Sequence, residues 1–110
     1  MKQSEINNFK RKYLDPNMRN EVNVIKHDPN TTPEHRRIVN DICEWAMTNK
    51  LSFYTRAYTQ WGEIVDIVIP SLVRPLIEVR HSELVKTKEY LSDYDGLRVY
   101  VDTNDPWRLL

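Results

Sequence analysis

The chain has 110 residues, 40% of them hydrophobic and 29% charged, a composition typical of one compact globular domain. Its 16 basic residues balance 16 acidic ones, which argues against a protein that coats nucleic acid by bulk electrostatic attraction. A single cysteine, Cys43, excludes an intramolecular disulfide and a zinc site built from several cysteines.

The N-terminal part of the chain predicts only short elements. Residues 4–14 carry apolar side chains at helical spacing, with Ser4 as a cap and Pro16 as the stop. Residues 21–25 alternate weakly, as in a short strand, and residues 27–32 predict a loop. No apolar run is long enough to cross a bilayer, and the N-terminus lacks the apolar stretch of a signal peptide. We therefore expect a cytoplasmic protein with no membrane partner.

The clearest helix covers residues 33–50. Thr32 can cap this helix, and Pro33 suits its first position. A single apolar stripe follows the helical period and consists of Ile38, Ile42, Trp45 and Ala46. The histidines next to the helix start, His27 and His35, have no metal-ligand spacing, and we expect both on the surface.

Three strand-like segments follow the helix, at residues 52–60, 63–70 and 75–81. Trp61-Gly62 and residues 71–74 are short enough to connect these segments as hairpins. A second helical pattern at residues 83–94 leads into a β-rich run at residues 97–102. A helix between the third and fourth strands is a crossover connection, so the order of elements predicts an α/β fold with one mixed sheet.

Two acidic residues interrupt the most apolar strands. Asp66 lies in a strand that is apolar on both faces, and Glu78 lies in an equally apolar strand 12 positions later. A carboxylate in such surroundings needs a cation or strong hydrogen-bond donors, because burying an unpaired charge is costly. Glu78 and Arg80 are two residues apart, so one strand sends both side chains to the same face. Hairpin pairing would bring the two acids together, and a divalent cation would relieve their repulsion.

The segments at residues 65–70 and 75–80 resemble the signature of the PD-(D/E)XK nucleases, and the order of elements over residues 33–103 is similar to their restriction-endonuclease-like core. The resemblance, closest to small archaeal resolvase-like members, implies a core at residues 33–110 behind an N-terminal extension at residues 1–32. It implies a metal-dependent DNA endonuclease. The implied Mg²⁺ or Mn²⁺ ligands are Asp66, Glu78 and the carbonyl of Val79, with Arg80 as a further catalytic residue.

Glu34 is a further candidate of the same kind, because some family members use an acid at the start of the preceding helix. Its place on the stripe with Ile38 and Ile42 predicts that it faces the sheet. A capping box formed with Thr31 is the alternative, in which Glu34 has no catalytic duty.

One departure from the family pattern affects the chemistry. Arg80 stands where the family has lysine, and arginine binds phosphate well but does not accept a proton near neutral pH. Lys86 and Lys88 could supply the missing lysine. The alternative function is therefore a catalytically inactive nuclease-like fold that binds nucleic acid or another protein.

The basic residues expected to contact DNA are Arg36, Arg37, Arg74 and Lys86. Cutting two strands with so small a subunit favours a homodimer. Structural ion pairs are the other interpretation of the acids, in which Asp66 and Glu78 are neutralised by Arg74, Arg80 or Arg98.

Overall fold

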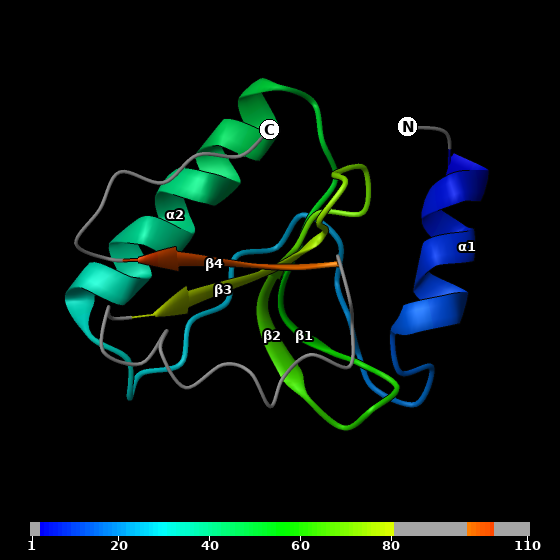
Figure 1. The fold of residues 1–110 in the computed structure, drawn as a ribbon, viewed down its shortest axis with the longest axis horizontal. Helices are drawn as coiled ribbons and strands as arrows, with labels where there is room; N and C mark the ends of the chain where they lie inside the picture. Colours follow the sequence, from blue (N-terminus) through cyan, green and yellow to red (C-terminus); the bar gives the residue numbers. More distant parts are fainter. Residues whose placement is uncertain (1–2, 81–96, 103–110) are drawn as a thin grey trace.

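The computed structural model describes residues 3–80 and 97–102. Within these residues the protein is α/β, with two helices and a four-stranded mixed sheet (Figure 1). The elements are α1 (Gln3–Tyr13), α2 (Pro33–Thr48), β1 (Tyr54–Tyr58), β2 (Ile64–Val68), β3 (Leu76–Arg80) and β4 (Arg98–Asp102). The helix predicted at residues 83–94 lies outside the described part of the chain. Neither α1 nor α2 is long and apolar enough to cross a membrane.

The sheet has the strand order β1-β2-β3-β4. Neighbouring strands are antiparallel from β1 to β3, whereas β3 and β4 are parallel. The predicted mixed sheet is confirmed, and the two strands that carry the acids, β2 and β3, are its central pair. Central position explains why their sequences are apolar on both faces.

Helix α2 covers one face of the sheet. The Thr32 hydroxyl accepts a hydrogen bond from the N–H of His35 at 3.1 Å, and proline occupies the first turn, as predicted. Its apolar stripe joins the strands in what we call the α2-side core: Ile38, Val39, Ile42, Cys43, Ala46, Phe53, Ile67, Ile69, Ile77, Val79 and Val101. Burial raises the pKa of the Cys43 thiol to about 12, so this cysteine is a protonated core residue and not a nucleophile.

The opposite face of the sheet is covered from the N-terminal extension. Leu14, directly after α1, is buried there, and Phe9 packs beside it. Figure 1 shows α1 and α2 on opposite sides of the sheet. The buried residues of this layer, which we call the α1-side core, are Leu14, Tyr54, Ala57, Val65, Val68 and Leu76.

The strand predicted at residues 21–25 is wrong, although the segment does run beside β1. Asn23 has a positive φ of 60°, which strand geometry does not allow. Its N–H donates to the Phe53 carbonyl at 2.7 Å, and its side-chain oxygen accepts from the Phe53 N–H at 3.1 Å. The Thr55 hydroxyl accepts from the N–H of Lys26 at 2.7 Å. Side chains thus replace part of a ladder that the sequence pattern suggested.

Candidate functional site

The pairing of β1 with β2 is interrupted at one position. Partners on either side of it share one register, from Tyr54 opposite Val68 to Tyr58 opposite Ile64, and this register would place Arg56 opposite Asp66. These two residues do not pair, because Arg56 has a positive φ of 46°.

The alternation of faces on β2 shifts at the same place. Val65 and Val68 belong to the α1-side core, whereas Ile67 belongs to the α2-side core. A regular strand would place Val65 and Ile67 on one face. The irregularity allows Arg56 and Asp66 to reach the same pocket.

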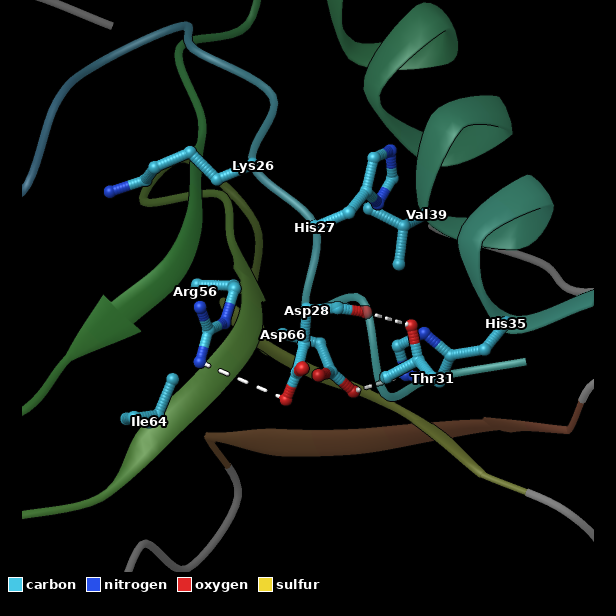
Figure 2. Close-up of a pocket in the computed structure, with 9 residues that line it drawn as sticks. All are labelled: Lys26, His27, Asp28, Thr31, His35, Val39, Arg56, Ile64 and Asp66. Atoms are coloured by element: carbon cyan, nitrogen blue, oxygen red, sulfur yellow. Dashed lines mark hydrogen bonds and ion pairs between the residues drawn. The ribbon is translucent and has the colours of Figure 1, made fainter. Parts of the chain in front are cut away.

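This pocket lies between the start of α2, the loop before it and strands β1 and β2 (Figure 2). Its volume is about 190 Å³. The lining residues are Lys26, His27, Asp28, Thr31, His35, Val39, Arg56, Ile64 and Asp66. The lining thus combines four side chains that can carry positive charge with two carboxylates, and Figure 2 shows the Lys26 ammonium group directed away from both acids.

The Asp66 side chain, which comes from β2, contacts both the neighbouring strand β3 and helix α2. Its Oδ2 accepts a hydrogen bond from the N–H of Val79 at 2.8 Å and lies 3.3 Å from Nε2 of His35. Both side chains of the His35–Asp66 pair are about four-fifths buried, with 18% and 20% of their surface exposed. The carboxylate is thus held by a backbone donor on β3 and an imidazole on α2.

Strands β2 and β3 stop pairing beside this carboxylate. The last regular pair is Ile67 with Ile77, and continuing its register would place Asp66 opposite Glu78. Instead, the N–H of Asp66 donates to Oε1 of Glu78 at 3.4 Å, while Asp66 itself accepts from Val79. Carboxylates therefore replace the ladder hydrogen bonds where the two central strands separate.

Glu78 has other surroundings than Asp66. Its neighbours Ile77 and Val79 both belong to the α2-side core, so alternation directs Glu78 to the opposite face of the sheet. Its Oε2 forms a buried ion pair with Arg98, whose guanidinium also contacts Oε1 of Glu63 at 2.7 Å. The side chains of Arg98 and Glu78 are 4% and 3% exposed. Of the ion pairs considered from the sequence, the one between Glu78 and Arg98 is present.

The prediction that Glu34 faces the sheet is wrong. Because Thr32 is the cap, Glu34 is the second residue of α2 and is exposed, and the N–H that the cap accepts belongs to His35. This register also rules out the capping box with Thr31. His35, which we expected on the surface, is the residue of this turn that reaches Asp66. Its spacing to Val39 and Ile42 is helical and could have revealed it.

The predicted DNA-contacting residues are not gathered at the pocket. Arg36 donates to the Thr31 carbonyl and so fastens the loop before α2. Arg37 and Arg74 are exposed, and neither lines the pocket. Lys86 lies outside the described residues. The sequence did not point to Lys26 and Arg56, whose place in the pocket depends on the path of the chain.

Fold and site together define a small α/β protein with a pocket of mixed charge, which lies where the pairing of β1 with β2 is interrupted. No protein-family model, curated protein or solved structure matches the chain. Over residues 3–80 and 97–102, no group of three or more histidine, cysteine, aspartate or glutamate side chains is placed to hold a metal ion.

Proposed function

We propose that this protein is a metal-dependent DNA endonuclease similar to the PD-(D/E)XK nucleases, acting at the junction of β2 and β3. The observation that carries the proposal is the contact between the Asp66 N–H and Oε1 of Glu78, at the point where the two central strands stop pairing. The strand order and directions, with β2 antiparallel to both neighbours and β3 parallel to β4, are compatible with the core of that family. Asp66 also opens to a pocket in which a substrate group can sit.

The residues at the junction have the right chemistry for a hard divalent cation. Two carboxylates and the Val79 carbonyl are oxygen ligands of the kind that Mg²⁺ and Mn²⁺ prefer. A bound ion would acidify a water molecule and stabilise negative charge on the phosphate. The chain itself orients Asp66 through the Val79 N–H and His35. Arg98 already contacts Glu78, so a cation has to share that carboxylate with a guanidinium.

Metal binding has a direct test in thermal unfolding. Mg²⁺ or Mn²⁺ at 100 times its Kd should raise the unfolding free energy by about 2.7 kcal/mol, and Tm with it. Asp66→Asn should abolish this increase, whereas Asp41→Asn, which removes an exposed carboxylate on α2, should keep it. Differential scanning calorimetry measures Tm with and without the metal. An equal increase in Tm for wild type and Asp66→Asn would place the ion elsewhere.

A second candidate function is a nuclease-like module that binds nucleic acid or another protein without cutting. The buried contact between Glu78 and Arg98 favours it, because this contact neutralises one proposed metal ligand. Arg80 in place of the family's lysine points the same way. We propose a homodimer for the endonuclease, since two sites are needed to cut both strands of a duplex.

Variants of Arg80 separate the two candidates. For an active enzyme, Arg80→Lys should keep or increase DNA cleavage in Mg²⁺, because lysine restores the family residue. Arg80→Ala should lose about 1–3 kcal/mol of transition-state stabilisation, measured as kcat/KM. A wild type that cuts no DNA, together with cleavage gained by Arg80→Lys, would instead identify a binding module.

A further inference from the structure

Arg56 adopts a backbone conformation that its side chain does not favour. A φ of 46° is in the left-handed region, which costs a residue with a Cβ atom roughly 1–2 kcal/mol. The ion pair with Asp28 does not offset this cost, because the closest N–O distance is 3.9 Å and the Arg56 side chain is 35% exposed. Strain of this kind is concentrated at functional sites, where position matters more than stability.

The strain places the Arg56 guanidinium at the pocket, opposite the start of α2. Figure 2 shows the carboxylates of Asp28 and Asp66 between Arg56 and His35, with Asp28 next to Arg56 and Asp66 next to His35. Lys26 also lines the pocket, but Figure 2 shows its ammonium group directed away from the two acids. Arg56 and His35 come from β1 and α2, so the fold and not one run of sequence brings these two side chains to the pocket.

The two acids of the pocket already have donors. Asp66 accepts from the Val79 N–H and pairs with His35, and Asp28 accepts from the N–H of Asn30 at 2.9 Å. Such donors stabilise a carboxylate in its charged form, so an anion in the pocket requires a cationic side chain that can approach it. The Arg56 guanidinium forms a weaker interaction, because its ion pair among the described residues is the long one with Asp28, at 3.9 Å.

We propose that this pocket binds a phosphate group without the help of a metal ion, and that Arg56 is the residue that positions it. Arginine recognises phosphate through paired N–H donors, which explains why a guanidinium is held here at a cost in strain. The volume of about 190 Å³ suits a small oxyanion, since pockets for drug-sized ligands span roughly 300–1,000 Å³. If the protein is the proposed endonuclease, on which this part of the inference rests, the bound group is a phosphodiester of the DNA substrate.

The test measures binding in EDTA at constant ionic strength, with inorganic phosphate and a short single-stranded oligonucleotide as probes. Amide NMR titrations of the wild type should show shifts at Arg56, His35 and Thr31. Arg56→Asn should raise Kd for both probes by about tenfold or more, because a charge-assisted contact is lost. Asparagine tolerates the left-handed conformation, so this variant should keep the wild-type Tm or exceed it.

Two matched variants complete the experiment. Arg19→Gln removes an exposed arginine outside the pocket and should leave both Kd values unchanged, whereas Arg56→Lys should bind with intermediate affinity. Equal affinity of Arg56→Asn and wild type, or an equal loss in Arg19→Gln, would overturn the phosphate site. The endonuclease proposal fails separately if the protein cuts no DNA in Mg²⁺. The phosphate site would still be supported in that case if binding in EDTA depends on Arg56.

Discussion

Replacing Arg98 by methionine is expected to lower the free energy of unfolding by about 3–5 kcal/mol. Arg98 contacts both Glu78 and Glu63, and its side chain is only 4% exposed. Methionine fills much of the same space but leaves the Glu78 carboxylate buried without its cation. Glu63 is 30% exposed and can be hydrated, so most of the cost should come from Glu78.

Urea unfolding of wild type and variants measures this effect. The matched control is Arg37→Met, an exposed position that should change stability by less than about 0.5 kcal/mol. The double variant with Arg98→Met and Glu78→Leu should recover most of the loss, because both buried charges are then gone. A loss below about 1 kcal/mol for Arg98→Met alone would show that Glu78 does not depend on this partner.

The second large effect concerns cleavage. If the protein is the proposed endonuclease, Asp66→Asn should reduce kcat/KM for DNA cleavage in Mg²⁺ on the order of 10²–10³-fold, as when a preorganised charged group is lost. Asparagine keeps an oxygen that can accept the Val79 N–H, so the junction of β2 and β3 should remain folded. The loss would therefore report chemistry and not unfolding.

A plasmid-nicking assay with Mg²⁺ and with EDTA measures this loss, and circular dichroism checks the fold of each variant. Asp41→Asn serves as the control, because its carboxylate is exposed and lies outside the pocket. Undiminished cleavage by Asp66→Asn would remove this residue from the reaction. Glu78→Gln is a poorer choice, since it also disturbs the buried contact with Arg98.

Local signals were sufficient to predict the main elements of the fold. Thr32 and Pro33 mark the start of α2 because capping and proline geometry act within a single turn. Apolar runs marked β2 and β3 as central strands, because residues covered on both faces have to be apolar. The acids at residues 66 and 78 stood out in those runs for the same reason. Hairpin pairing predicted that their carboxylates would share one site, whereas in the structure Asp66 contacts His35 and Glu78 contacts Arg98.

The partners of these acids were decided only by the tertiary structure. Arg98 is 20 residues from Glu78, and His35 is 31 residues from Asp66, so no local pattern connects them. The direction of the Asp66 side chain depends on an irregularity at Arg56 in the neighbouring strand, whereas Glu78 follows the regular alternation of β3. Period-two reasoning assumes a regular strand and fails at such a position. The sequence by itself thus determined α2, the four strands and the acidic residues within them, whereas the register between distant segments determined what surrounds those acids.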